Sequence, residues 1–127
     1  MEPGPVGETL THDVIGCAIA VHRELGPGML ESVYEECLCL ELGQAGIPFQ
    51  RQRPVPIIYR GIPPGVGFRI DVLVAGALVV EIKAVERVLP VHESQVLTYL
   101  RFGGFRLGLL MNFHTRSLTA GLKRLSL

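Results

Sequence analysis

Three ionisable residues interrupt two strongly apolar segments of the sequence. Asp71 lies within residues 68–74, and Glu81 and Lys83 lie within residues 79–85. Burying charge in apolar surroundings is costly unless the groups pair with one another or hold a cation. Two carboxylates are hard oxygen ligands of the kind that Mg²⁺ prefers, and a nearby lysine can orient a water or stabilise a phosphate. A buried ion pair that satisfies itself explains the same residues equally well.

The register of the hairpin that carries these residues separates the two interpretations. Alternation along a strand points Glu81 and Lys83 to one face. Asp71 joins that face if it stands opposite Glu81, which requires a three-residue loop at 75–77. A two-residue loop would instead place Asp71 opposite Val80 and separate the carboxylates. The metal hypothesis therefore predicts the odd register, or a bulge that restores it.

Composition bounds the class of protein. The chain has 127 residues, of which 48% are hydrophobic and 19% charged, and 12 basic side chains balance 12 acidic ones. These values predict one packed domain and argue against strong non-specific binding of polyanions. The longest apolar run, residues 72–80, is far shorter than the ~20 residues of a membrane span. With three cysteines and no apolar, basic leader, we expect a soluble, cytoplasmic protein.

The elements that must position the charged residues follow from periodicity and from helix breakers. We expect a loose leader over residues 1–10 and a single domain over 11–127. Helices are predicted at 12–25, 29–43 and 91–102. Strands are predicted at 49–59, 68–74, 78–85 and 105–113, and residues 118–127 are expected to add a short strand or helix. The order ααβββαβ, with that last element, predicts an α+β domain with helices flanking a mixed sheet.

The first predicted strand carries two prolines and two arginines. Pro54 and Pro56 cannot donate hydrogen bonds to a neighbouring strand, which predicts an edge strand or an irregular one. Arg51 and Arg53 are two residues apart and are expected on one face, where they could contact phosphates. Solvated arginines with no binding role fit the sequence at least as well.

Two predicted helices present polar pairs that could complete a site. Glu31 and Tyr34 share a face of the second helix, and Gln95 and Tyr99 share a face of the third. We take both tyrosines as candidate substrate contacts. A helical glutamate beside an apolar stripe is more often an exposed flank, so Glu31 alone is a weak signal.

Several blocks of sequence together resemble a known family. The segment Gly28-Met29-Leu30-Glu31-Ser32-Val33-Tyr34 matches the pattern GxxExxY. The other blocks, in chain order around it, are 21–28, Asp71…Glu81-Ile82-Lys83, 95–100 and 108–113. Over residues 12–126 the chain resembles the GxxExxY protein family, a branch of the PD-(D/E)xK nuclease superfamily. Ile70 stands where the superfamily name has proline, and this change leaves metal ligation intact.

This resemblance implies a restriction-endonuclease-like core and Mg²⁺-dependent hydrolysis of phosphodiester bonds in DNA or RNA, with Mn²⁺ as an alternative ion. It implies Asp71, Glu81 and Glu31 as metal ligands. Lys83 corresponds to the catalytic lysine, and Gln95 to the polar residue that closes the site. Nucleic acid is the implied partner, and a homodimer would suit an enzyme that cuts two strands. The alternative is a non-catalytic module that keeps the fold and binds nucleic acid or protein.

Overall fold

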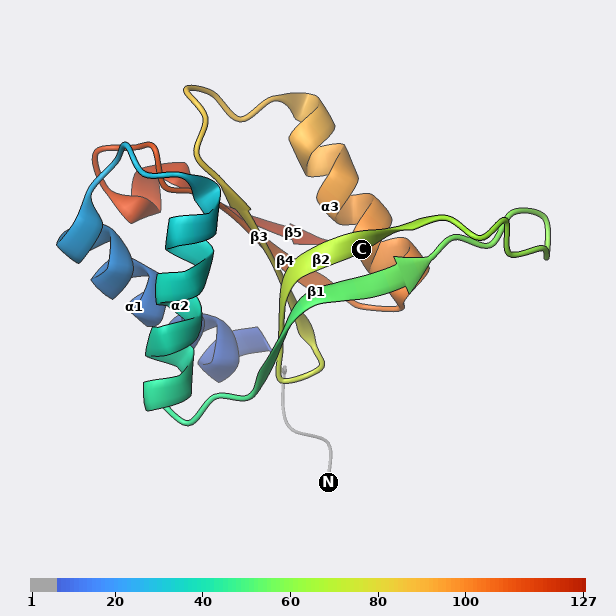
Figure 1. The fold of residues 1–127 in the computed structure, drawn as a ribbon, viewed down its shortest axis with the longest axis horizontal. Coiled ribbons are helices and arrows are strands. Elements are labelled where there is room, and N and C mark those ends of the chain that lie inside the picture. The colour runs from blue at the N-terminus through green and yellow to red at the C-terminus, as the bar shows by residue number, and fades with distance from the viewer. Residues whose placement is uncertain (1–6) are drawn as a thin grey trace.

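The computed structural model describes residues 7–127 and has the predicted order of elements, two helices followed by a sheet that a third helix interrupts (Figure 1). The helices are α1 Gly7–Leu25, α2 Glu31–Gln44, α3 Pro90–Gly103 and the short 3₁₀ helix η1 Leu118–Gly121. The strands are β1 Phe49–Pro56, β2 Gly67–Val74, β3 Leu78–Lys83, β4 Leu107–Asn112 and β5 Leu122–Ser126. The C-terminal segment thus forms both a short helix and a strand.

Helix α1 begins earlier than the sequence predicts. Residues 7–10, expected in the leader, already belong to the helix. Residues 1–6, the rest of that leader, lie outside the described residues. The predicted end at Leu25 is confirmed, where Gly26 adopts a positive φ of 68° and breaks the helical backbone.

The five strands form one mixed sheet in the order β1-β2-β3-β4-β5. Strands β3 and β4 are parallel because α3 carries the chain back between them, and the remaining neighbours are antiparallel. Strand β1 lies at the edge, as its prolines predict. This arrangement confirms the α+β fold class and is consistent with a restriction-endonuclease-like core.

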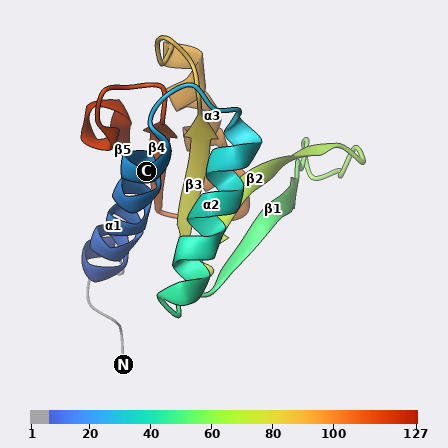
Figure 2. The same ribbon diagram turned by 60° about the vertical axis from the view of Figure 1, so that its left-hand side comes forward.

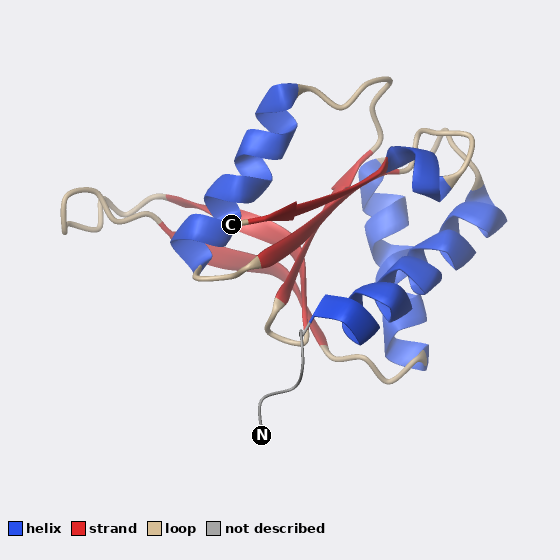
Figure 3. Cartoon of the chain, turned by 180° about the vertical axis from the view of Figure 1, so that it is seen from behind, coloured by secondary structure: helices blue, strands red, loops and turns tan. Residues whose placement is uncertain are grey.

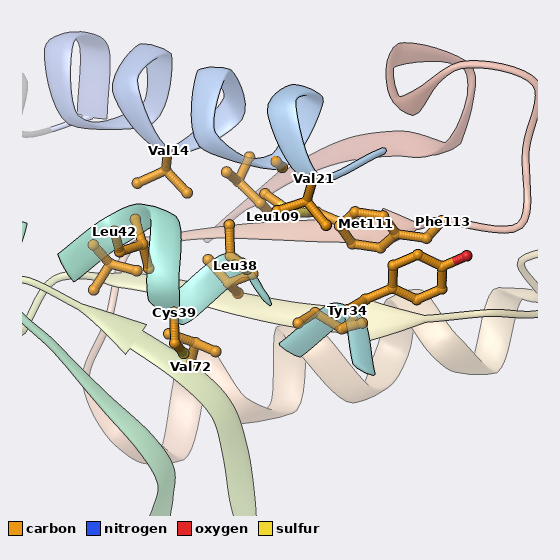
Figure 4. Close-up of a cluster of buried hydrophobic side chains, with 14 of the residues drawn as sticks. Val14, Val21, Tyr34, Leu38, Cys39, Leu42, Val72, Leu109, Met111 and Phe113 are labelled. Carbon is orange, nitrogen blue, oxygen red and sulfur yellow. The ribbon is translucent and has the colours of Figure 1, made fainter. Parts of the chain in front are cut away.

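Helices cover both faces of the sheet (Figures 2 and 3). Helices α1 and α2 pack on one face over the first core cluster, which includes Leu38, Val72 and Met111 (Figure 4). Helix α3 packs on the other face, where Val96 and Leu100 join a second cluster. The two clusters define a three-layer arrangement in which the central strands are buried on both sides.

The hairpin between β2 and β3 has the odd register. Val74 pairs with Leu78 across the loop 75–77, and Val72 pairs with Val80. Continuing this register places Asp71 opposite Glu81, as the metal hypothesis requires.

None of the helices among residues 7–127 is long and apolar enough to cross a membrane.

The stability of the sheet edge near η1 can be tested at a glycine. A Cβ atom added to Gly121 would collide with the main-chain oxygen of Asn112. We expect Gly121→Ala to lower the free energy of unfolding by about 1–3 kcal/mol, the usual cost of overpacking, in urea unfolding followed by circular dichroism.

Gly16→Ala is the matched control. Gly16 lies in α1, and an added Cβ meets no neighbour within 4 Å. Alanine there should be neutral or stabilise by roughly 0.5–1 kcal/mol. Equal effects of the two substitutions would contradict this account of the packing.

Candidate active site

Asp71 and Glu81 form a carboxylate pair on neighbouring strands, in which Glu81 is buried and Asp71 is half-buried. Only 6% of Glu81 is exposed. Oδ2 of Asp71 accepts a hydrogen bond of 2.8 Å from the backbone N–H of Ile82. Oε1 of Glu81 is buried and has no hydrogen-bond partner among the described residues. A buried acceptor without a donor is costly, so this oxygen favours a bound cation or a proton.

The surroundings favour protonation of both carboxyl groups. Burial, followed by the charge of Asp71, raises the pKa of Glu81 to about 8, although Lys83 opposes the shift. Burial also raises the pKa of Asp71, and the Ile82 N–H opposes that shift. Two adjacent carboxylates in a low dielectric cannot both ionise cheaply. The pair therefore attracts positive charge.

Lys83 lies beside this pair. Its Nζ is 3.7 Å from Oε2 of Glu81, and its side chain is mostly buried. Ile82, between them in sequence, belongs to the core cluster on the opposite face. The prediction that Glu81 and Lys83 share one face of β3 is thus confirmed.

The backbone changes its facing pattern at Asp71. Val72 belongs to the cluster under α1 and α2, whereas both Leu73 and Ile70 belong to the α3 cluster. Strict alternation would place Ile70 and Leu73 on opposite faces. On the neighbouring strand, Gln52 has a positive φ of 52°. These irregularities lie at the same height in β1 and β2, next to the carboxylate pair.

This distortion overturns the prediction that Arg51 and Arg53 share a face. Arg51 stands opposite Val72 on the α1–α2 face, and Arg53 stands opposite Ile70 on the α3 face. The physical reason is the left-handed conformation of Gln52 between them, which breaks the alternation.

A glutamate on α2 holds this part of β1. Glu35 is buried, with 8% exposed, and accepts hydrogen bonds from Arg51 and from the Gln52 amide. Arg51 also pairs with Glu36 at 2.9 Å. Two carboxylates therefore engage Arg51, and we leave it out of the proposed substrate surface. The signal for Glu35 was its spacing of four residues from Glu31, which places both on one helical face.

Glu31 approaches the site but does not join the carboxylate pair. Its Oε2 accepts a 3.2 Å hydrogen bond from the backbone N–H of Ala84. Its charge reaches both Asp71 and Glu81 and contributes to raising their pKa values. Within residues 7–127, no three His, Cys, Asp or Glu side chains gather closely enough to hold a metal ion. The three-carboxylate arrangement is therefore not assembled in this conformation.

The two tyrosines predicted as substrate contacts have different surroundings. Tyr34 is fully buried, its ring stacks on Phe113, and its hydroxyl donates to the carbonyl of Gly26. The Met29 N–H donates to the same hydroxyl. Tyr34 therefore supports the α1–α2 turn, and this structural position excludes it from our proposed substrate surface.

Tyr99 lies on α3 near the carboxylate pair. Its ring stacks on Phe68 with centroids 4.4 Å apart. Burial, then the charges of Glu81 and Asp71, raise the pKa of Tyr99 to about 12. Gln95 lies one turn earlier on α3 and is half-buried. Helix α3 thus carries a phenol close enough to respond to the carboxylates.

Asn112 is a further residue of the site that sequence reasoning did not single out. Its side-chain amide donates to the carbonyl of Val85 at 2.8 Å, and its Oδ1 accepts from the Val85 N–H at 3.1 Å. Asn112 stands opposite Lys83 in the parallel β3–β4 pair. It therefore holds the backbone that follows Lys83. The sequence could have indicated Asn112, because it is the one polar side chain at the end of the apolar segment 107–112.

A central hairpin that carries Asp71…Glu81-x-Lys83 within a mixed, helix-flanked sheet is characteristic of the restriction-endonuclease-like class. The sequence comparison agrees. The model of the PD-(D/E)XK nuclease superfamily matches residues 8–125, and the chain belongs to this superfamily. No curated protein and no solved structure matches the chain.

The raised pKa of Glu81 predicts a pH-dependent stability in the absence of metal. Glu81 has an ordinary pKa of 4.5 and a pKa of about 8 in the folded protein. Between these two pH values, Glu81 has lost its proton in the unfolded chain but retains it in the folded protein. The free energy of unfolding should therefore fall across this range, by at most about 1.4 kcal/mol per pH unit, and level off above it. Glu81→Gln should remove this contribution, so that its stability relative to the wild type rises with pH.

Urea unfolding in EDTA over this pH range measures the effect. Glu86→Gln, which alters an exposed side chain on the loop after β3, is the control and should follow the wild-type profile. Parallel pH profiles for Glu81→Gln and the wild type would contradict the assignment.

Proposed function

We propose that this protein is a metal-dependent nuclease that hydrolyses phosphodiester bonds of DNA or RNA, and that it belongs to the GxxExxY branch of its superfamily. The observation that carries the proposal is the unpartnered Oε1 of Glu81, buried next to Asp71. A structural ion pair between Glu81 and Lys83 has no need of a second carboxylate, that of Asp71, which raises the cost of ionising Glu81. A site for a divalent cation does.

The chemistry of the donor set fits Mg²⁺, or Mn²⁺ in its place. Asp71 uses Oδ2 for the Ile82 N–H, and Glu81 directs Oε2 toward Lys83. Each carboxylate retains a second oxygen for the ion, and Glu31 could join from the end of α2 if its bond to Ala84 opens. When bound, the ion would supply Lewis-acid stabilisation of the phosphate charge.

The remaining side chains have roles that their positions support. Lys83 would orient the attacking water or stabilise negative charge that develops on the phosphate. Its ion pair with Glu81, at 3.7 Å, holds the ammonium group near the site. This distance is longer than a hydrogen bond, so the ammonium group can still donate to a water or a phosphate. Gln95 and Tyr99 on α3 would position the water or the substrate from the opposite side. Of the two arginines predicted to contact phosphates, we keep Arg53, which lies on the face that α3 covers.

Loss of single site residues tests this function. We expect Asp71→Asn, Glu81→Gln and Lys83→Ala each to reduce cleavage of labelled DNA or RNA by at least about 100-fold in Mg²⁺ or Mn²⁺, because each removes a charge used in the transition state. Initial rates from gel analysis of substrate and product measure the effect.

Glu36→Gln is the matched control, since Glu36 pairs with Arg51 on the exposed side of α2 and should leave cleavage unchanged. Cleavage unaffected by Lys83→Ala would contradict the proposal. Tight, salt-sensitive and metal-independent binding without cleavage would instead favour the non-catalytic module.

A further inference from the structure

The connection between β1 and β2, together with the strand ends that flank it, projects from the sheet as an arm, which we define as residues 53–70 (Figure 1). The strands of the arm pair from Arg53–Ile70 to Pro56–Gly67. Beyond them, Tyr59 and Ile62 form a further antiparallel bridge. The arm is therefore a two-stranded ribbon that continues directly from the part of β2 that holds Asp71.

The charge of the chain is segregated around this arm. Residues 42–70 contain four arginines and no acidic residue, although the whole chain is neutral. Arg51 is paired on α2. The three other arginines contact no acidic side chain among residues 7–127. They are Arg53, Arg60 and Arg69. The arm is thus a locally basic, exposed projection on a neutral protein.

The tip of the arm is a tight turn with an unusual residue at its apex. Tyr59 and Ile62 exchange both backbone hydrogen bonds, at 2.8 and 2.9 Å. Arg60 and Gly61 between them both have positive φ, 52° and 82°, as a type I′ turn requires. Glycine, asparagine or aspartate is favoured at such positions, so an arginine there is strained and suggests a role outside folding.

Apolar side chains flank this arginine. Tyr59 and Ile62 are each 65% exposed, and Ile58 and Val66 are also exposed. Exposed apolar groups gathered on one projection are typical of a binding surface. In the major groove of DNA, arginine contacts phosphates or guanine edges and apolar side chains contact thymine methyl groups, so this combination suits a DNA groove.

We propose that the arm grips a DNA duplex beside the phosphodiester that the site cleaves, a proposal that rests on the nuclease function. Arg53 and Arg60 contact phosphates along the groove. Between these contacts, the tip inserts the apolar side chains of Tyr59 and Ile62. The continuity of the arm with β2 sets the gripped duplex at a fixed offset from Asp71. The protein thus acquires local affinity for duplex DNA despite its neutral charge.

The shape and charge of the arm favour this partner over others. A two-stranded ribbon fits the major groove of B-form DNA, whereas the groove of A-form RNA is too narrow for side chains to enter. Two arms that met in a dimer would bring together like charges with no acidic residue between them. A single strand has no groove for the two-stranded ribbon to enter, so the shape of the arm favours a duplex.

The test measures binding in EDTA, so that it does not depend on cleavage. The probe is a fluorescein-labelled DNA duplex of about two helical turns, titrated by anisotropy between about 50 and 200 mM salt. The slope of log affinity against log salt should become shallower by about 1 in Arg60→Gly and by about 2 in Arg53→Gln/Arg60→Gly. Arg60→Gly should not lower the melting temperature, because glycine relieves the positive φ.

Arg116→Gln/Arg124→Gln is the control. It removes two exposed arginines far along the chain, in the loop before η1 and in β5, and should leave the salt slope unchanged. An unchanged slope in the arm variants overturns the proposal. Loss of a dimer in sedimentation with unchanged DNA binding, equal loss of single-strand or duplex-RNA binding, or a lower melting temperature of Arg60→Gly overturns it as well. Absent cleavage with intact, arm-dependent duplex binding would contradict the nuclease function alone.

Discussion

The structure depends on the cost of placing two carboxylates side by side in a low-dielectric sheet. Burial raises the pKa values of both Asp71 and Glu81, and the charge of Asp71 raises that of Glu81 further. One ammonium group, that of Lys83, lies against them and opposes these shifts only in part. The apolar clusters on both faces of the sheet stabilise the fold enough to hold this unfavourable pair. The site therefore has affinity for positive charge before any substrate arrives.

The backbone geometry that creates this pair also shapes the edge of the sheet. The odd register of the β2–β3 hairpin sets Asp71 opposite Glu81. At the same height, the left-handed conformation of Gln52 is held by a hydrogen bond to Glu35 on α2. As a result, the side-chain alternation of β1 is broken at Gln52, and Arg53 lies on the face of the sheet that α3 covers. The distortion at Gln52 and Asp71 thus determines which face Arg53 occupies, next to the carboxylate pair that the hairpin register brings together.

Local patterns predicted the elements but not the contacts that join distant elements. Helical periodicity and the prolines of β1 correctly predicted the order of elements and the edge position of β1, and the metal hypothesis predicted the odd register of the β2–β3 hairpin. The faces of Arg51 and Arg53 were predicted wrongly because alternation was assumed, whereas Gln52 responds to a glutamate 17 residues away. The burial of Tyr34 likewise depends on stacking with Phe113, which no local pattern reveals.

Calorimetric titration of the protein with Mn²⁺ near pH 7, in buffers of different ionisation enthalpy, tests directly whether Asp71 and Glu81 bind a cation. Since the pKa of Glu81 is about 8, we expect one bound ion and the release of close to one proton, because a ligating carboxylate must be deprotonated. Glu81→Gln should abolish both the binding and the proton release. No binding at millimolar Mn²⁺, or binding without proton release, would contradict the account.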